Sequence, residues 1–224
     1  MHNVVAMYNC TLCTEINGGR SLHADFYPER SGSRYLIQER DWVVMPTIGP
    51  IVVGHILMVA RRHVSSSLNS NAAELESGST MLNRISKKIS TDFSQDVVVF
   101  EHGEAFCDQK RAGACIDHAH LHVAPVSRLF VPYLQSQFDQ WLVSDTLCGL
   151  REALRERPYI LIGAVTHGTV LFLGRVCDGT IPSQYLRLQL AMFVGEQQRW
   201  NWRNTRSVDV FERTIESWNN GVQV

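Results

Sequence analysis

The sequence lacks a long apolar run, a signal-like N-terminus and an excess of charge of either sign. None of its apolar runs reaches the roughly 20 residues that a transmembrane helix needs. Lys and Arg number 21 and Asp and Glu 22, for a formal net charge of −1, which argues against nucleic-acid binding through bulk positive charge. The first ten residues lack the charged, apolar and small-residue segments of a signal peptide, so a cytoplasmic location is expected.

Low-complexity tracts and obvious internal repeats are also absent. The 224 residues, 45% of them hydrophobic, suffice for one large domain or two small ones. There are six cysteines, and only Cys10 and Cys13 form a C-x-x-C pattern. Disulfides are uncommon in cytosolic proteins, so this pair is a candidate for metal binding, provided that other parts of the chain supply further ligands.

The pattern of apolar residues predicts an α+β protein, with a boundary near residue 127. Residues 1–34 contain several chain breakers and are expected to form loops. Before residue 127, periodicity predicts a helix over 72–90 and strands over 40–45, 55–60, 97–100 and 116–125. After it, we expect a helix over 133–155 broken near Gly149, a hairpin of 159–163 and 169–173 that turns through His167 and Gly168, and helices over 181–194 and 208–218.

Three histidines alternate with apolar residues between positions 118 and 123. Side chains at i, i+2 and i+4 of a strand lie on one face, so His118, His120 and His122 are predicted to share a face. Adjacent imidazoles oppose one another's protonation, which favours neutral rings near pH 7 that can act as nucleophiles, proton carriers or metal ligands. A catalytic zinc site and a row of solvated surface histidines are the alternatives.

The triple-histidine segment resembles the defining motif of the histidine-triad superfamily, His-φ-His-φ-His-φ-φ, where φ is apolar. Residues 53–63 are similar to the family's second block, a histidine-containing strand, and residues 101–103 to its short turn before the motif strand. The resemblance implies an antiparallel sheet with helices in a nucleotide-binding catalytic domain over 1–127. Residues 128–224 would then form an α/β extension, a helix–hairpin–helix arrangement.

By this resemblance, His120 is expected to attack the α-phosphorus of a nucleotide conjugate and form a covalent nucleotidyl-histidine, which water then hydrolyses. A neutral imidazole is a competent nucleophile at pH 7. His122 would contact the phosphate oxygens, and His55 would join them from the neighbouring strand. Further substrate contacts are expected from residues at or near the corresponding family positions, which are Thr47, Glu101, Gly103 and Cys115. The loop before the motif strand is several residues longer than in small family members, and its Lys110 and Arg111 are expected to reach a second phosphate or the leaving group, unless the loop is simply solvated.

Two of these positions depart from the family pattern. Thr47 stands where relatives often carry an acidic residue that holds the ribose hydroxyls, and Cys115 stands where they carry Ser or Thr, a stronger hydrogen-bond donor. The third histidine is His122, where similar uridylyltransferases and phosphorylases carry Gln, which favours hydrolysis. A nucleotidyltransferase or phosphorylase, and a zinc-stabilised nucleotide-binding module with little turnover, remain alternatives.

Zinc-containing members of the family, of the C-x-x-C type, hold a structural Zn²⁺ with that pair and two histidines. The resemblance places the ligands at Cys10, Cys13, His63 and His118. Two sulfur and two nitrogen ligands suit a closed tetrahedral site. In this arrangement His118 is a ligand rather than a catalyst, which argues against zinc hydrolase chemistry at the three histidines.

The last hundred residues contain no unambiguous chemical motif. Gln184 and Arg187 lie near the start of the helix predicted over 181–194, where an anion contact is expected if it is not simply a capped helix. Simple family members are homodimers and larger relatives fuse two similar halves. This chain is therefore expected to be a homodimer, or a monomer in which the C-terminal half replaces a partner.

Overall fold

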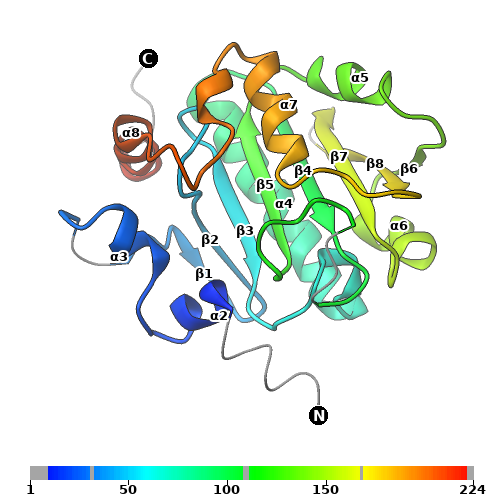
Figure 1. Ribbon diagram of the computed structural model, residues 1–224, viewed down its shortest axis with the longest axis horizontal. Coiled ribbons are helices and arrows are strands. Elements are labelled where there is room, and N and C mark those ends of the chain that lie inside the picture. Colours follow the sequence, from blue (N-terminus) through cyan, green and yellow to red (C-terminus); the bar gives the residue numbers. More distant parts are fainter. Residues whose placement is uncertain (1–9, 31–32, 108–110, 167–168, 221–224) are drawn as a thin grey trace.

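The fold is one antiparallel sheet with helices on both faces. The computed structural model describes residues 10–30, 33–107, 111–166 and 169–220, and in them the strand order is β1-β2-β3-β5-β4-β7-β8-β6 (Figure 1). The predicted α+β class is therefore confirmed. Within the described ranges, no helix has the length and apolar character needed to cross a membrane.

The described residues form the following strands and helices, given in chain order. The strands are β1 (Ile37–Gln38), β2 (Trp42–Pro46), β3 (Ile56–Ala60), β4 (Val97–Gly103), β5 (His120–Pro125), β6 (Leu142–Ser144), β7 (Tyr159–Thr166) and β8 (Thr169–Val176). The helices are α2 (Thr11–Ile16), α3 (Leu22–Phe26), α4 (Ala72–Phe93), α5 (Phe130–Gln135), α6 (Leu147–Leu154), α7 (Tyr185–Phe193) and α8 (Val208–Asn220), with 3₁₀ turns η1 (Ser67–Asn69) and η2 (Gln197–Arg199).

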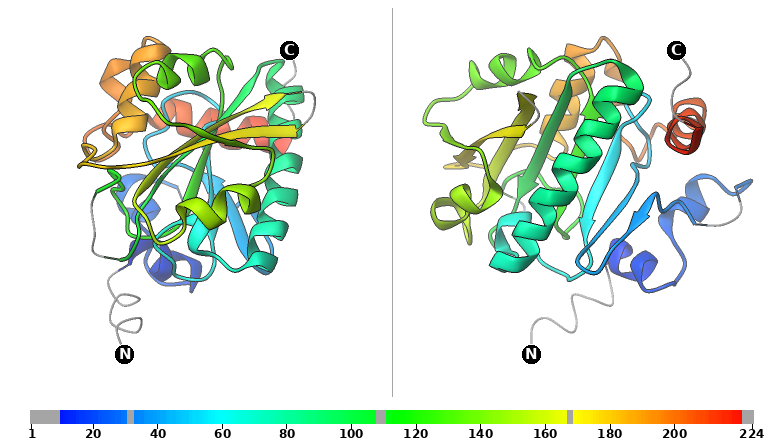
Figure 2. Two further views of the ribbon diagram at one scale, coloured as in Figure 1. Left: turned by 90° about the vertical axis from the view of Figure 1, so that its right-hand side faces the viewer. Right: turned by 180° about the vertical axis from the view of Figure 1, so that it is seen from behind.

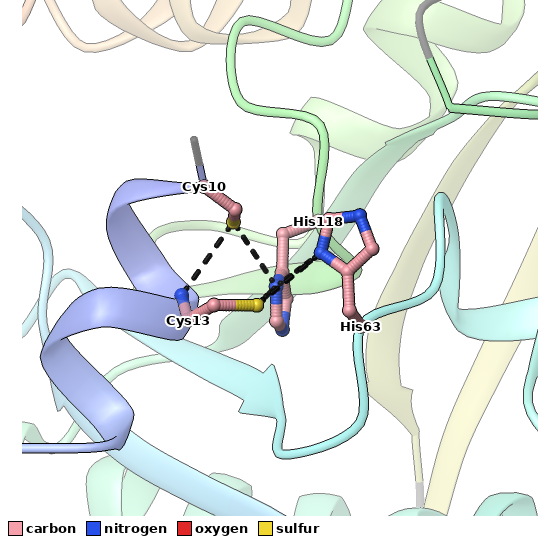
Figure 3. A group of neighbouring side chains, drawn as sticks. All are labelled: Cys10, Cys13, His63 and His118. Carbon is pink, nitrogen blue, oxygen red and sulfur yellow. Dashed lines mark hydrogen bonds between the residues drawn. The ribbon is translucent and has the colours of Figure 1, made fainter. Parts of the chain in front are cut away.

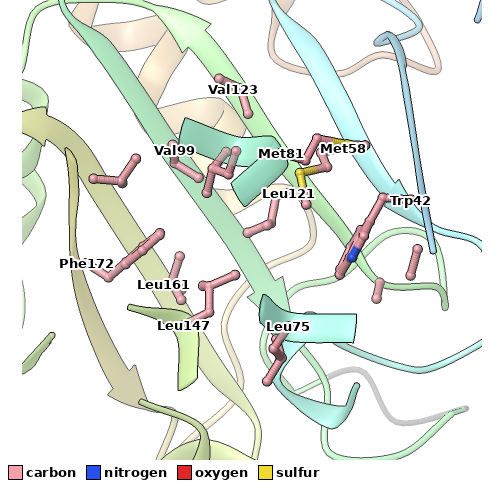
Figure 4. Close-up of a cluster of buried hydrophobic side chains, with 14 of the residues drawn as sticks. Trp42, Met58, Leu75, Met81, Val99, Leu121, Val123, Leu147, Leu161 and Phe172 are labelled. Atoms are coloured by element: carbon pink, nitrogen blue, oxygen red, sulfur yellow. The ribbon is translucent and has the colours of Figure 1, made fainter. Parts of the chain in front are cut away.

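One face of the sheet is covered by α4 and α6. Helix α4 begins with a reciprocal cap in which the Asn71 side chain accepts from the Glu74 amide and the Glu74 carboxylate accepts from the Asn71 amide. Its apolar residues recur at helical spacing and pack on the strands, with Leu121 and Val123 of β5 pointing into the same core (Figure 4). This core occupies the face opposite to the one that carries His120 and His122.

The second face is covered by α5 and α7, and the two helical layers lie on opposite sides of the sheet (Figure 2). Phe100 and Ala124 point into this second core with apolar residues of both helices. Short helices from the two ends of the chain meet beside it, where Tyr27, just after α3, stacks on Phe211 of α8 with ring centroids 4.0 Å apart. The N- and C-terminal segments therefore pack against each other beside the end of β2.

Four details of the predicted elements are wrong. Residues 133–155 form α5, β6 and α6 rather than one broken helix, because Leu142–Ser144 pairs with β8. Residues 1–34, expected to be loops, contain α2 and α3 in their described part. Helix α7 starts at Tyr185, since Gln184 before it has φ 62°. The motif strand begins at His120, two residues after His118.

The predicted hairpin is present as β7 and β8, while its turn residues His167 and Gly168 lie outside the described residues. Strand β7 also pairs with β4, from Val98↔Ala164 to Gly103↔Tyr159. Residues on both sides of position 127 therefore share one sheet. The C-terminal segment occupies the edge of β4 that would otherwise be open for pairing with another chain.

Candidate active site

His120 and His122 lie on the central strand β5, facing the second core, and both are buried. His122 pairs in register with Leu57 of β3 and Phe100 of β4, and its ring stacks on Phe100 at 4.5 Å between centroids with an interplanar angle of 4°. Because a strand alternates its faces, the apolar residues between the histidines anchor β5 in the opposite core. The two catalytic candidates are thus held by packing on both faces.

The hydrogen bond of His120 determines which of its nitrogens is free. Its Nδ1 lies 2.6 Å from the carbonyl oxygen of His118. A carbonyl only accepts, so Nδ1 carries the proton and donates. The other nitrogen, Nε2, then has an unprotonated lone pair, which is the form that a nucleophilic imidazole requires.

A second chain of hydrogen bonds orients His122. The amide of Ile51 donates to Nδ1 of His55, with 3.3 Å between the nitrogens, so the His55 proton resides on Nε2. That proton is donated to Nδ1 of His122, 3.0 Å away. Nε2 of His122 consequently carries a proton and is a hydrogen-bond donor. The site therefore places a lone pair on His120 beside an N–H on His122, whose ring centroid is 5.2 Å away.

Burial keeps these imidazoles neutral. Loss of solvation is the main cause that lowers the pKa of His55, His120 and His122, and the positive charge of Arg187 lowers the pKa of each further. His102, on β4, is also buried, and its pKa falls to about 3, mainly through burial, with His120 and Arg187 adding to the shift. At pH 7 the site thus combines neutral histidines with the nearby guanidinium of Arg187.

A pocket opens beside His120 and His122, and both side chains line it. The predicted substrate residues Thr47, Cys115 and Arg187 line it. Its remaining walls are mostly apolar and come from segments far apart in the chain. They are formed by Leu12, Leu22, Ile48, Leu57, Ile116 and Trp202, together with Arg34. The indole Nε1 of Trp202 donates to the Cys115 sulfur at 3.2 Å.

Trp202 and Arg34 are pocket residues that no sequence motif marks. Arg34 is buried in a bidentate ion pair with Glu15, at 2.8 Å for both nitrogen–oxygen contacts, and also donates to the Pro46 carbonyl. Arg34 is held beside the pocket because Glu15 of α2 and the Pro46 carbonyl at the end of β2 both bind its guanidinium. His23 is also buried, and its ring lies against those of Tyr27 and Phe211.

Several predicted substrate residues lie away from the pocket. Glu101 is on the opposite face of β4, where Tyr159 Oη donates to it at 2.6 Å and Ser67 donates through its amide and hydroxyl. Gly103 faces the Tyr159 ring. Gln184 is buried against Asn201 and the Trp202 backbone. Lys110 lies outside the described residues.

Arg111 is exposed, and its backbone amide donates to the Glu104 carboxylate. Glu104 is a fully buried residue that the sequence analysis did not identify. Its carboxylate also accepts from the amides of Ala112 and Ala114, at 2.9 and 3.3 Å. This carboxylate therefore anchors the loop that delivers Cys115 to the pocket.

The four predicted metal ligands lie together beside the active site (Figure 3). Cys10 and Cys13 come from the start of α2, His63 follows β3, and His118 precedes β5; one ligand atom from each lies within 4.8 Å of the others. Nε2 of His118 is 2.6 Å from the Ala60 carbonyl and must be the donor. Its Nδ1 is then unprotonated and faces the two sulfurs, each at 3.4 Å.

The spacing of these ligand atoms fits zinc. Bonds of about 2.3 Å to sulfur and about 2.0 Å to nitrogen, at tetrahedral angles, separate sulfur and nitrogen by about 3.5 Å. The sulfur–nitrogen distances here are 3.3 and 3.4 Å, and the two ligand nitrogens are 3.3 Å apart. Nε2 of His63 lies 3.3 Å from the sulfur of Cys107, an outer contact that orients the His63 ring and that no sequence pattern revealed.

Comparison with known proteins identifies the domain that carries this site. Residues 30–128 match the family model of the HIT domain. The similarity to the HIT domain therefore lies in residues 30–128, and strands β6 to β8 and helices α5 to α8 lie beyond the matched residues. The comparison with curated proteins finds no match.

Solved structures with some similarity include a HIT-like protein involved in cell-cycle regulation from Bartonella henselae, with 16% identity and a TM-score of 0.41 over 54% of this chain and 81% of that one. A hypothetical histidine triad nucleotide-binding protein from Sulfolobus tokodaii has 20% identity and a TM-score of 0.40 over 53% and 70%. A zinc-bound histidine triad family protein from Mycobacterium smegmatis has 15% identity and a TM-score of 0.36 over 55% and 78%.

Proposed function

We propose that this protein hydrolyses a nucleotide conjugate at its α-phosphorus through a covalent intermediate on His120. The observation that carries the proposal is the tautomer of His120, because its Nδ1 donates to the His118 carbonyl and leaves the Nε2 lone pair free beside the pocket. Burial keeps that lone pair unprotonated at neutral pH by lowering the pKa of the ring. Such a group is a ready nucleophile without prior proton removal.

In the first step, Nε2 of His120 forms a bond to phosphorus while the bond from phosphorus to the leaving-group oxygen breaks, and that oxygen leaves with the electron pair. The N–H of His122 donates to a phosphate oxygen, in the orientation that His55 imposes. In the second step, water adds to phosphorus and the phosphorus–nitrogen bond breaks. The water oxygen stays on the nucleotide, and its protons pass to the leaving group and to solvent.

We infer that Cys10, Cys13, His63 and His118 hold a structural Zn²⁺, supported by the closed sulfur and nitrogen ligand set and its spacing. When bound, the ion supplies structural cross-linking and leaves no open position for substrate. His118 connects the metal site to the active site. Its backbone carbonyl accepts a hydrogen bond from His120, while its ring faces the sulfurs of Cys10 and Cys13. The metal site would therefore fix the backbone that holds His120 in its reactive tautomer.

Mass spectrometry after incubation with candidate substrates tests the covalent intermediate. The panel comprises dinucleoside polyphosphates, nucleoside phosphoramidates, acyl-adenylates and nucleotide sugars. The wild-type protein is expected to carry an acid-labile nucleotidyl adduct on His120, and H120A is expected to lose both the adduct and turnover while keeping its cooperative unfolding transition. Turnover that persists in a folded H120A protein would refute the mechanism.

The acceptor distinguishes hydrolysis from transfer. Release of the nucleotide into water alone supports the hydrolase, whereas faster release with inorganic phosphate or a sugar phosphate, and a product that contains the acceptor, would assign a phosphorylase or nucleotidyltransferase. Nucleotide binding without adduct or turnover on any member of the panel would assign a zinc-stabilised binding module. Hydrolysis is proposed because His122 supplies an imidazole N–H at the third triad position.

A further inference from the structure

Among the described residues, the pocket beside the histidines contains one cation without a partner charge. Two cationic residues line it, Arg34 and Arg187. Arg34 forms its ion pair with Glu15, whereas Arg187 forms no salt bridge with any carboxylate in the described part of the chain. The Arg187 side chain is almost fully buried, with 1% of its surface exposed, and a buried charge is costly unless an opposite charge offsets it.

The hydrogen bonds of Arg187 hold it in place and leave one nitrogen unused. Nε donates to the Trp200 carbonyl at 2.9 Å, and Nη2 donates to the carbonyls of Gly49 at 2.6 Å and Arg199 at 3.3 Å. Nη1 is buried and has no hydrogen-bond partner among the described residues. The guanidinium is therefore fixed by three neutral acceptors, none of which balances its charge.

We infer that Arg187 is the anion-binding residue of the active site, whose unused Nη1 takes a phosphate oxygen of the substrate. The inference rests on the proposed function, which it deepens by assigning the positive charge that the reaction needs. Attack on phosphorus adds negative charge to the phosphate oxygens, and the neutral histidines supply hydrogen bonds but no charge to offset it. A preorganised guanidinium in a poorly hydrated site supplies that stabilisation.

The position of Arg187 in the chain has a structural consequence. It lies on α7, outside the matched HIT domain at 30–128, and its side chain donates to the Gly49 carbonyl of that domain. The C-terminal segment therefore completes the phosphate site from within the same chain. A HIT domain cut at residue 128 would retain the nucleophile but lose its cation.

Anion-dependent stabilisation tests this assignment without turnover. Thermal unfolding is measured with inorganic phosphate and with AMP, GMP, CMP and UMP, in the wild type, R187Q, R187K and R199Q. Arg199 lies in the same segment, but its side chain contacts Glu196 and the Ile51 carbonyl rather than the pocket. We expect the anion-dependent rise in Tm to vanish in R187Q, to persist in part in R187K and to be unchanged in R199Q.

An R187Q protein that keeps the full anion-dependent rise, or a wild type with none, would overturn the assignment. If R187Q does not fold, diffraction from wild-type crystals soaked in tungstate decides, since an anomalous peak within hydrogen-bond distance of Nη1 supports the site and peaks only elsewhere refute it. In active protein, R187Q is expected to lower kcat/KM by about 100-fold or more. The H120A protein separates the two proposals, because it should keep the anion response even where covalent chemistry fails.

Discussion

The buried imidazole of His102 predicts a measurable loss of stability in acid. The folded-state pKa of His102 lies near 3, against 6.5 for an exposed histidine. As the pH falls below 6.5, His102 binds a proton in the unfolded chain but stays neutral in the folded chain, so the unfolded state is favoured. The contribution of the neutral His102 ring to the free energy of unfolding is present above pH 6.5 and is lost progressively as the pH falls towards 3.

The size of the effect follows from the two pKa values. Between pH 7.5 and pH 5, the difference in proton binding at His102 removes about 2 kcal/mol from the free energy of unfolding. H102Q abolishes this contribution, because Gln does not titrate in this range. Its Oε1 can still accept from the Leu186 amide, which donates to Nε2 of His102 at 3.0 Å in the wild type.

Urea unfolding of both proteins at several pH values between 5 and 7.5 measures the difference. The wild type is expected to lose about 2 kcal/mol more than H102Q across this range. The four metal ligands and the other buried histidines are the same in both proteins, so their titration cancels in the comparison. Parallel pH profiles for the two proteins would refute the burial argument.

Three further predictions concern the metal site and the opposite face of the sheet. C13S is expected to lower the zinc content, measured by mass spectrometry of the metal, from one ion per chain to a small fraction and to lower the Tm, whereas C148S, at an exposed thiol, should match the wild type in both. G103A should lower the free energy of unfolding, measured in urea, by at least about 2 kcal/mol, because its Cβ would lie 2.0 Å from the Tyr159 ring. G179A is the control, since a Cβ there would have nothing within 4 Å. Equal losses of stability in the two variants would contradict the packing argument. Burial raises the pKa of Glu101 to about 7, so the free energy of unfolding of the wild type should fall by about 3 kcal/mol as the pH rises from 4.5 through 7. In urea unfolding, the stability of E101Q should depend less on pH over this range. The same pH dependence in both proteins would contradict the raised pKa of Glu101.

Much of the fold and of the metal site can be predicted from local patterns. The alternation around His120 is enough to place the strand and its two faces, because side-chain direction in a strand depends only on position. The C-x-x-C pair, the histidine after β3 and the first triad histidine are likewise readable from motif spacing. Their spatial clustering agrees with that interpretation.

Other features depend on contacts that no local pattern encodes. Glu101 looks like a site residue from its place beside the motif, yet strand alternation turns it toward Tyr159, a residue of the C-terminal segment. The segment 133–155 appears helical in isolation, but its middle joins β8 because an edge strand was available for pairing. Both errors concern residues whose partners lie far along the chain.

The sequence by itself was enough to predict the similarity to the HIT domain, the candidate catalytic histidines and the candidate metal ligands, since each depends on residue type and short spacing. Only the tertiary structure decided which nitrogen of His118 and of His122 is free, because the groups that select these tautomers, the Ala60 carbonyl and the His55 ring, come from other segments. It also decided the charge of the pocket, where Arg187 from α7 meets the loop at Gly49. Burial gives that guanidinium its chemical significance, and burial arises only when distant segments pack together.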